Sequence, residues 1–437
     1  MKNRFRNALA LAAAGAITLA GCSDPGADTG SDGPVSWPAQ DADLSGTTLT
    51  IWAAQNSNTV PDSVIAGFEE LTGAEVEVVT IPDPYEQGVQ TKVATGDKPD
   101  LAFWQPTASQ LTAINASQNL QPLDDAPWLD AYKPELRDIT GILDDTRYAA
   151  LITTPAVEGV YYNKEVFAAN GITATPTDWD SFLQTARDLK GAGVTPFHEM
   201  AADKWGTQWW VQVLLADAAA DGLWDRVNAN EEKFTDPTIQ GAIDTYQGLI
   251  DEGLFNEDIK TATFEDQGAA LLAGDAAMVM QVNSYFGQLQ SLADTEELNQ
   301  KIGFFPISPS GNTGTFIPDQ SNALVAFKTG DEKREAAARQ LLSYWMGDGY
   351  EDFVNAQSTV SLQTGVETPA DVPEALLAVS DSVGTSVGSM QAQAIANPDL
   401  YIYLADMIQG TKTPAEVAEA TQAQFEELAK AQGAEGF

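Results

Sequence analysis

The charged and nucleophilic side chains of this chain form none of the short motifs that bind nucleotides or activate a serine. The sequence contains no GxxxxGK[ST] phosphate loop, no GxGxxG turn after a strand and no GxSxG nucleophile turn. His198 is the only histidine and Cys22 the only cysteine. A multi-histidine metal site is therefore impossible within one chain, and we expect neither a metal nor a cofactor.

Carboxylates give a weaker indication. Asp144-Asp145 and Glu69-Glu70 are adjacent pairs, but neighbours in sequence point apart on a helix and rarely act as an acid/base pair. A lone histidine such as His198 is more often a structural residue than a catalytic one. Two distant carboxylates can still meet in a folded glycosidase. A surface glycosidase that uses Glu158 is thus one alternative interpretation.

Aromatic residues beside polar ones form the most informative chemical pattern. Sugar rings have apolar C–H faces and polar edges, so aromatic planes together with amides or carboxylates suit them. In open α/β sheets, such residues converge beyond the carboxyl ends of strands. The pattern therefore favours a sugar site. The segments concerned are Trp104-Gln105, Trp205 with Asp203, Asn283-Ser284-Tyr285 and Tyr401-Ile402-Tyr403, and Trp209 belongs to the same tryptophan-rich middle of the chain.

Alternating strands and helices must position these residues. β-rich segments lie at 49–52, 75–81 and 101–104, and segments with helical spacing lie between them at 61–71 and 85–95. This rhythm predicts an α/β sheet with parallel members. The second half continues it with a helix at 264–272, a buried strand at 277–280, and a helix that starts at Thr413-Pro414 with Glu416 in its first turn.

The first 22 residues read as a secretory leader. Lys2, Arg4 and Arg6 precede an uncharged run over 8–20, which is too short to span a membrane. The closing Leu19-Ala20-Gly21-Cys22 resembles the lipobox of bacterial lipoproteins. This resemblance implies that residues 1–21 are removed and that Cys22 carries the lipid. Residues 22–45 are rich in Ser, Asp, Gly and Pro and predict a flexible tether.

Composition restricts the partners. The formal net charge is −41, and the leader removes three basic residues and no acidic ones, so the mature chain is more acidic still. Such a charge repels nucleic acid and anionic membranes, which leaves the Cys22 lipid as the only membrane contact. It permits a cationic ligand. The length suits two domains with real cores.

Several motifs together resemble the extracellular solute-binding proteins of carbohydrate ABC importers, the family of maltose-binding protein. The resemblance covers nearly the whole mature chain. It is carried by an opening strand and helix, a "G-x-x-P-D" strand, a "YNK" crossover, a "P-x-T-W-x-x-F" helix start and a "G-x-A-A-M" strand entry. In this sequence they stand at 49–52 with 64–73, at 96–104, at 155–164, at 176–182 and at 274–278.

The resemblance implies a periplasmic-binding-protein-like α/β fold, with two α/β lobes joined by crossover hinge segments around a central ligand cleft. We expect residues 46–156 with 283–328 to form the first lobe, and 157–282 with 329–437 the second. The implied function is a monomeric, non-enzymatic receptor outside the cytoplasm. It captures a neutral mono- or oligosaccharide and delivers it to the transmembrane subunits of an ABC permease.

Carried over by position, the resemblance also names site residues. Trp104 would stack on the sugar or flank it, and Glu158 would reach it from the crossover. Asn283, just after a second-lobe strand, would occupy the cleft position at the return crossover, and Tyr401, Trp205 and Trp209 would contribute from the second lobe. We expect Trp104→Ala to weaken sugar binding at least about tenfold, or 1.4 kcal/mol, with little change in melting temperature.

Two departures from maltose-binding protein argue against maltose itself. Gln55-Asn56-Ser57 replaces a charged pair, and Gln105 begins a Gln-Pro-Thr segment where an acidic contact would be expected. Asp319, with Glu199 and Asp203, supplies charge for the alternative ligand, a polyamine.

Overall fold

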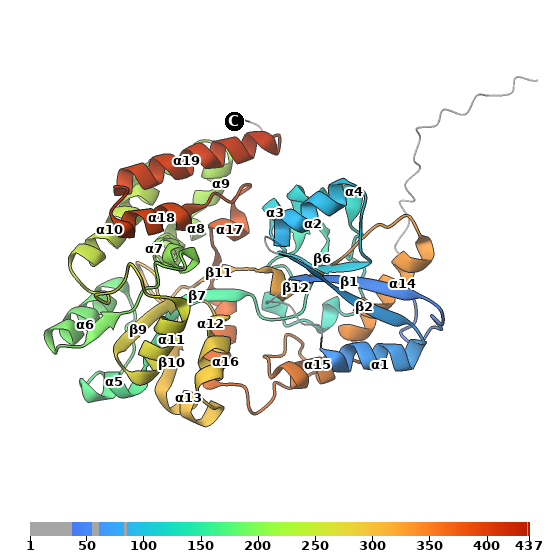
Figure 1. Ribbon diagram of the computed structural model, residues 1–437, viewed down its shortest axis with the longest axis horizontal. Helices are drawn as coiled ribbons and strands as arrows, with labels where there is room; N and C mark the ends of the chain where they lie inside the picture. Colours follow the sequence, from blue (N-terminus) through green and yellow to red (C-terminus); the bar gives the residue numbers. More distant parts are fainter. Residues whose placement is uncertain (1–36, 55–60, 83–84, 435) are drawn as a thin grey trace, which may run out of the picture. The chain divides into compact units, whose positions relative to one another are not determined.

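The computed structural model describes residues 37–54, 61–82, 85–434 and 436–437 of the chain. Across these ranges, no helix combines the length and the apolar character that crossing a bilayer requires. The strands form two larger sheets, each with helices on its faces (Figure 1). These sheets define the two α/β lobes that the sequence predicts.

The first sheet has the strand order β2-β1-β3-β12-β6. β1 is parallel to β2 and β3, whereas β12 runs antiparallel to β3 and β6. The strands span β1 (Thr48–Ala54), β2 (Glu75–Ile81), β3 (Leu101–Phe103), β6 (Ala149–Leu151) and β12 (Ala323–Ala326). The short hairpin β4 (Ile142–Leu143) and β5 (Thr146–Arg147) stands apart from it.

Helices cover both faces of this sheet, because alternate strand residues point to opposite sides. On β1, Ile51 packs in one apolar cluster with Phe68 and Leu341, whereas Trp52 packs in another with Val89 and Leu111. The first face carries α1 (Asp62–Thr72), α14 (Glu332–Trp345) and α15 (Tyr350–Gln357), and the second carries α2 (Tyr85–Ala94), α3 (Ala108–Ala113) and α4 (Ala116–Asn119) (Figure 1).

The second sheet has the order β13-β11-β7-β9-β8, and β10 also pairs with β7. β10 and β11 are both antiparallel to β7 and occupy different stretches of it, opposite 160–163 and 156–158. The strands span β7 (Ala156–Asn163), β8 (Thr195–Phe197), β9 (Ala276–Gln281), β10 (Ile302–Phe305), β11 (Thr315–Ile317) and β13 (Val387–Gly388).

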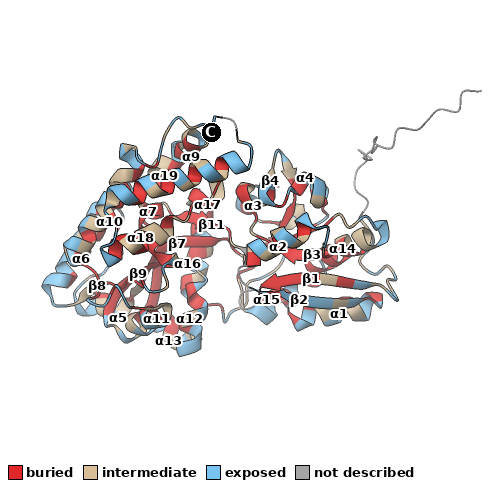
Figure 2. Cartoon of the chain, turned by 45° about the horizontal axis from the view of Figure 1, so that its top comes forward, coloured by how far each residue is buried: buried red, intermediate tan, exposed pale blue. Residues whose placement is uncertain are grey.

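The remaining helices belong to the second lobe, where the strands are coloured as buried and the helices carry exposed residues on their outer faces (Figure 2). They are α5 (Lys164–Ala169), α6 (Trp179–Gly191), α7 (Trp209–Leu214), α8 (Ala216–Ala220), α9 (Leu223–Asn228), α10 (Pro237–Asp251), α11 (Phe264–Ala273), α12 (Tyr285–Leu292), α13 (Thr295–Lys301), α16 (Glu374–Ser382), α17 (Met390–Gln393), α18 (Leu400–Gln409) and α19 (Pro414–Ala431). Short 3₁₀ turns occupy Leu129–Ala131, Pro134–Leu136, Trp205–Gln208, Gln320–Asn322 and Val383–Thr385.

Local signals in the sequence explain several helix ends. Thr413 caps α19 in a reciprocal hydrogen-bonded box with Glu416, as its sequence predicts. α1 ends at Gly73, whose φ of 73° places it in the left-handed region. Gly274, with φ 79°, ends α11 in the same way. Helices therefore begin and end where capping chemistry is encoded locally.

The division of the chain between the lobes differs from the expected one. β10 and β11 lie within the range 283–328 that was assigned to the first lobe, but they pair with β7 in the second sheet. Conversely, α14 and α15 follow residue 328 and pack on the first lobe. The chain thus returns to the first lobe only at β12. β10 and β11 both pair with β7, and this pairing keeps residues 302–317 in the second sheet.

Part of the predicted tether packs against the first lobe. Residues 22–36 lie outside the described part, but Trp37 packs edge-on against Trp128 with ring centroids 5.0 Å apart. The Leu44 N–H donates to the Thr72 carbonyl at 2.8 Å. The Gln340 amide donates to the backbone carbonyls of Gln40 and Ala42. Residues 37–44 therefore form a strap that packs against the first lobe.

Candidate functional site

Two crossover segments connect the sheets and lie side by side. The first runs from β6 to β7 over 152–155, and the second from β11 to β12 over 318–322. The ladders on either side are in register, since Ala156 lies opposite Ile317 in the second sheet and Leu151 opposite Ala323 in the first. The crossovers run antiparallel to each other. β6, which precedes the first crossover, pairs with β12, which follows the second, and β11, which precedes the second crossover, pairs with β7, which follows the first.

A cavity of about 180 Å³ lies against both crossovers. Among the described residues, its lining offers six hydroxyl groups, four side-chain amides, one carboxyl group and four aliphatic side chains, with no aromatic ring. Such a surface hydrogen-bonds neutral hydroxyl groups as donor and as acceptor. The lining residues are Thr153, Thr154, Ala156, Asn283, Ser284, Gln290, Asp319, Ser321, Asn322, Gln357, Ser358, Thr359, Val360, Leu376 and Val379.

Asp319 provides the one carboxyl group among the described residues that line this cavity. It accepts hydrogen bonds from the Ser321 backbone N–H at 2.7 Å and from the Ser321 hydroxyl. Burial raises the pKa of Asp319, because a low-dielectric surrounding disfavours the charged form. A ligand hydroxyl that donates a hydrogen bond to this carboxyl group would replace the hydrogen bonds from water that burial removes.

Thr154 presents an unsatisfied group in the same lining. Its side chain is 7% exposed, and its Oγ1 has no hydrogen-bond partner. A buried hydroxyl without a partner costs free energy, since water no longer solvates it. Thr154 therefore favours an occupant that can hydrogen-bond there.

Asn283, one of the site residues proposed from the sequence, lines the cavity from the second-lobe side. Its Oδ1 accepts a hydrogen bond from the Val157 N–H at 2.8 Å, which fixes the start of β7 beside the end of β9. The structure thus brings Asn283 and Asp319 to one cavity, although 36 residues separate them in the sequence.

Glu158 lies elsewhere. It shares one face of β7 with Ala156 and Val160, both in the second lobe's apolar core, and its side chain has no exposed surface. The Thr315 hydroxyl donates to its Oε2, while Oε1 has no partner. Burial raises its pKa to about 8. Glu158 is thus a buried acid of the sheet, and the expectation that it reaches a ligand is not supported by its position.

Trp104 is also buried rather than presented. It has no exposed surface, its ring lies 6.4 Å from that of Tyr85, and its Nε1–H donates to the Gln110 carbonyl at 3.1 Å. This position does not support the expected contact with a sugar, because Trp104, directly after β3, packs with Ala102 and Tyr85 inside the first lobe. Gln105, next in sequence, instead donates to the Pro318 carbonyl of the second crossover at 2.9 Å.

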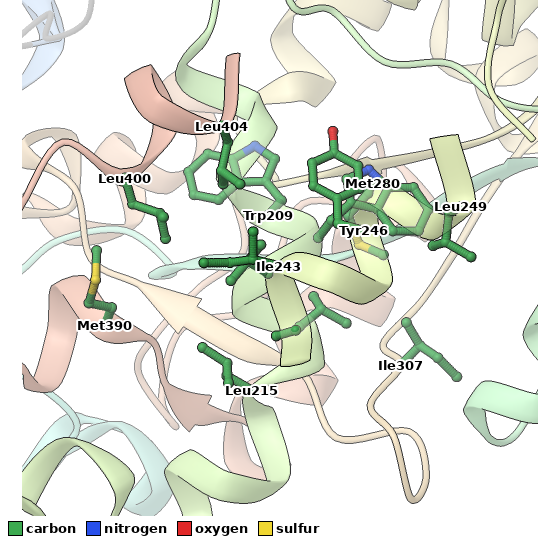
Figure 3. Close-up of a cluster of buried hydrophobic side chains, with 14 of the residues drawn as sticks. Trp209, Leu215, Ile243, Tyr246, Leu249, Met280, Ile307, Met390, Leu400 and Leu404 are labelled. Atoms are coloured by element: carbon green, nitrogen blue, oxygen red, sulfur yellow. The ribbon is translucent and has the colours of Figure 1, made fainter. Parts of the chain in front are cut away.

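The remaining predicted aromatics form a separate group in the second lobe. Trp205 is half-buried and lies 6.2 Å from Trp209 and 5.1 Å from Phe264, ring centre to ring centre. Trp209 belongs to the apolar core, beside Leu404 (Figure 3). The Tyr401 carbonyl accepts from the Thr207 hydroxyl at 2.9 Å. None of these three predicted aromatics lines the crossover cavity.

Gln55, Asn56 and Cys22 lie outside the described residues. The two acids proposed to accompany Asp319 have other roles. Asp203 accepts from the Phe264 N–H at the start of α11 at 2.6 Å. Glu199 is buried, accepts from the Tyr246 hydroxyl at 2.9 Å, and has a pKa that burial raises to about 7.

Sequence reasoning missed most of the cavity. Thr153 and Thr154 precede Pro155, and Ser321 and Asn322 closely follow Pro318. A proline flanked by small polar residues between two apolar strands was the available signal. Within the described ranges, no cluster of three or more His, Cys, Asp or Glu side chains could hold a metal ion.

Comparison with known proteins identifies the class. The family model for bacterial extracellular solute-binding proteins matches residues 53–352, and the chain belongs to this family. An uncharacterized ABC transporter extracellular-binding protein from Pyrococcus horikoshii is 23% identical over 247 residues, or 54% of this chain and 55% of that relative. The match therefore spans about half the length of that protein. Lipoprotein LipO from Bacillus subtilis is 22% identical over 79% of this chain and 70% of its own length.

A solved structure supports the same fold. RafE from Streptococcus pneumoniae, in its apo form, superposes with a TM-score of 0.71 at 20% identity, over 91% of this chain and 99% of RafE. The two-lobed architecture of solute-binding proteins is thus confirmed for this chain.

Proposed function

We propose that this protein is the substrate-binding receptor of an ABC importer and that it captures a neutral mono- or oligosaccharide between its two lobes. The ligand would then pass to the transmembrane subunits of a permease. The cavity at the crossovers carries the proposal. Its hydroxyls, amides and single carboxyl group match the donors and acceptors of a polyhydroxylated ligand.

The ligands of related proteins support a carbohydrate. RafE has been solved in complex with raffinose, and other relatives are named as binding proteins for diacetylchitobiose and for α-glucosides. The absence of an aromatic ring from the cavity favours a ligand held mainly by hydrogen bonds. Trp205 and Tyr401, both half-buried in the second lobe, do not line this cavity.

The positions of the three acidic residues considered for a cationic ligand argue against a polyamine. Of the three carboxylates considered for a cation, only Asp319 lines the cavity, while Asp203 and Glu199 are engaged with Phe264 and Tyr246. The glycosidase alternative also loses support, because Glu158 has no exposed surface with which to touch a reacting atom. We propose binding without catalysis, and without a cofactor.

We further propose that the protein is a monomer held at the outer surface of the cell membrane by a lipid on Cys22. The lipobox-like Leu19-Ala20-Gly21-Cys22 supports this, as does the lipoprotein name of its relative LipO. In membrane fractionation, the wild-type chain should sediment with membranes and the Cys22→Ser variant should not. Equal distribution of both chains would contradict the anchor.

The ligand is tested by thermal shift on the full chain, purified in detergent, against monosaccharides, disaccharides, raffinose, polyols and spermidine. A ligand at one hundred times its Kd adds about 2.7 kcal/mol to the free energy of unfolding. A sugar that raises the melting temperature, and shows 1:1 binding by calorimetry, supports the proposal. A response to spermidine alone would keep the receptor and replace the ligand class.

A further inference from the structure

The crossover cavity is small and has two chemically different sides. Its volume of about 180 Å³ lies below the roughly 300 to 1,000 Å³ that pockets for drug-sized ligands enclose. We propose that this cavity recognises one neutral sugar ring, and that the Thr154 hydroxyl is the group that selects a hydroxylated ring. This inference rests on the proposed function, because it narrows the ligand of the same site.

The volume of the cavity limits its occupant to about one ring. A water molecule accounts for about 30 Å³ of the liquid, so the cavity has the room of about six waters, which is roughly the volume of one pyranose with its hydroxyl groups. A further ring would need about as much space again. It would therefore extend beyond the lining of the cavity, and we expect it to add little to the binding free energy.

The two crossovers supply a polar side of the cavity. Thr153 and Thr154 come from the first crossover, and Asp319, Ser321 and Asn322 from the second. Hydrogen bonds join these residues to one another. Asn322 Nδ2 donates to Thr153 Oγ1 and to the Thr154 carbonyl, both at 3.0 Å, and the Ser321 N–H donates to Asp319 at 2.7 Å. Because the protein itself holds this side in place, little conformational freedom is lost when a ring binds to it.

α16 supplies an aliphatic side. Leu376 and Val379 both line the cavity, and their spacing of three residues places them on one face of this helix. Val360, which follows α15, adds another aliphatic side chain to the lining. The C–H face of a sugar ring is apolar, so aliphatic side chains can cover it without an aromatic plane. A ring with this face toward α16 would direct its hydroxyl groups to the crossovers.

Thr154 differs from its neighbour Thr153 in the hydrogen bonds of its hydroxyl group. The Thr153 hydroxyl accepts from Asn322 Nδ2 at 3.0 Å and donates to the Ser321 carbonyl at 3.3 Å. The Thr154 hydroxyl, on a side chain that is 7% exposed, has no partner among the described residues. A ring hydroxyl that reaches Thr154 therefore gains a hydrogen bond that the protein by itself does not form, and it removes the cost of an unsatisfied buried group.

Two glutamines add hydrogen-bonding groups from both lobes. Gln290 lies on α12 of the second lobe, and Gln357 is the last residue of α15, which packs on the first lobe. A side-chain amide carries both donors and an acceptor, so each can meet a ring hydroxyl in either role. The polar groups of the cavity thus suit several hydroxyl groups of one ring at the same time.

The same lining disfavours an anionic sugar. Among the described residues that form it, none is Lys, Arg or His, and the one ionisable side chain is Asp319. A carboxylate or phosphate on the ring would be desolvated there without a cation to pair with it. It would also be repelled by the Asp319 carboxylate. The cavity therefore favours a neutral ring over the corresponding sugar acid.

Ligand size is tested by isothermal titration calorimetry on the full chain in detergent. The ligands are glucose with maltose and maltotriose, galactose with melibiose and raffinose, xylose, arabinose and galacturonate. A neutral monosaccharide should bind at least as tightly as the longer sugars that contain it, and a sugar acid at least about tenfold more weakly than its neutral form. A trisaccharide that binds more than about tenfold tighter than its own monosaccharide would overturn the single ring while the receptor function stands.

The role of Thr154 is tested with a matched pair of variants. Without any sugar, Thr154→Val should keep or raise the melting temperature, because it replaces an unpartnered hydroxyl by a methyl group of similar size. Thr153→Val removes a hydroxyl with two partners and should lower it. With the monosaccharide that binds best, Thr154→Val should weaken binding about tenfold, and Thr154→Ser should restore most of that loss.

These outcomes separate the inference from the proposed function. A Thr154→Val chain that melts as early as Thr153→Val, or that binds the monosaccharide as tightly as wild type, would overturn the role of Thr154 alone. If no sugar of any length binds, the proposed function and the single ring are both contradicted. The comparison of melting temperatures without sugar still shows in that case whether the Thr154 hydroxyl is an unsatisfied group.

Discussion

The hydroxyl of Thr315 donates a hydrogen bond to Glu158 across the buried ladder between β11 and β7. It is the one partner of a carboxyl group whose Oε1 has none. Desolvation outweighs this hydrogen bond and raises the Glu158 pKa from 4.5 to about 8. The folded protein therefore holds a neutral acid inside its second sheet.

This pKa predicts a pH-dependent stability. Below pH 4.5 both folded and unfolded chains carry the proton, and Glu158 contributes no penalty. Between pH 4.5 and about 8 the unfolded chain releases it while the folded chain keeps it, so the free energy of unfolding falls as pH rises. Above about pH 8 the penalty is constant.

We expect Glu158→Gln to raise the free energy of unfolding at pH 8 by on the order of a few kcal/mol, and to change it little at pH 4. Urea denaturation at both pH values measures this difference. Glu199→Gln serves as a comparison, because burial raises the Glu199 pKa only to about 7. A Glu158→Gln chain that keeps the full pH dependence of the wild type would contradict the buried neutral acid.

Trp104→Ala should destabilise the protein rather than act on the ligand alone. The side chain is fully buried, and removal of such a ring leaves a void that costs about 3 to 5 kcal/mol. Differential scanning calorimetry should show a lowered melting temperature. Trp205→Ala, at a half-buried ring, is the matched control and should lower it less. An unchanged melting temperature for Trp104→Ala would restore the original expectation of an exposed, ligand-stacking ring.

Asp319→Ala should weaken binding of the sugar found by thermal shift about tenfold or more, equivalent to 1.4 kcal/mol. The reason is that it removes the only carboxyl group of the cavity. Isothermal titration calorimetry measures the Kd. Asp203→Ala, which removes a helix-start hydrogen bond away from the cavity, should lower stability and leave the Kd near that of wild type. Equal affinity of the Asp319→Ala and wild-type chains would remove Asp319 from the site.

The strap over residues 37–44 should contribute measurable stability. Trp37→Ala removes the edge-on contact with Trp128, and a contact of this kind is worth about 1 kcal/mol beyond its buried area. Limited proteolysis should then cut this segment faster than in wild type. Lys133→Ala, a change of the neighbouring surface without an aromatic contact, is the control. Identical cleavage of the wild-type and Trp37→Ala chains would show that the segment is not held by this ring.

The sequence by itself determined the class of fold and most of its elements. The strands at β1, β2, β3 and β9 and the starts of α1, α11 and α19 lie within a few residues of their predicted places. These features are local: a period of two or of 3.6, a capping threonine and a terminating glycine act over a few residues. The motif at 155–164, which the resemblance assigns to the first crossover, instead covers Pro155 at the end of that crossover and then β7.

The tertiary structure alone decided which side chains face a ligand. Trp104 and Glu158 matched family positions along the sequence, but the register of β3 and β7 directs both side chains into apolar interiors. Asn283 and Asp319 met only because β9, β11 and β12 bring distant segments beside one crossover. Side-chain direction depends on strand register and on pairing between residues far apart in the chain. Because successive side chains of a strand point to opposite faces of the sheet, a shift of one residue in register moves each side chain to the other face.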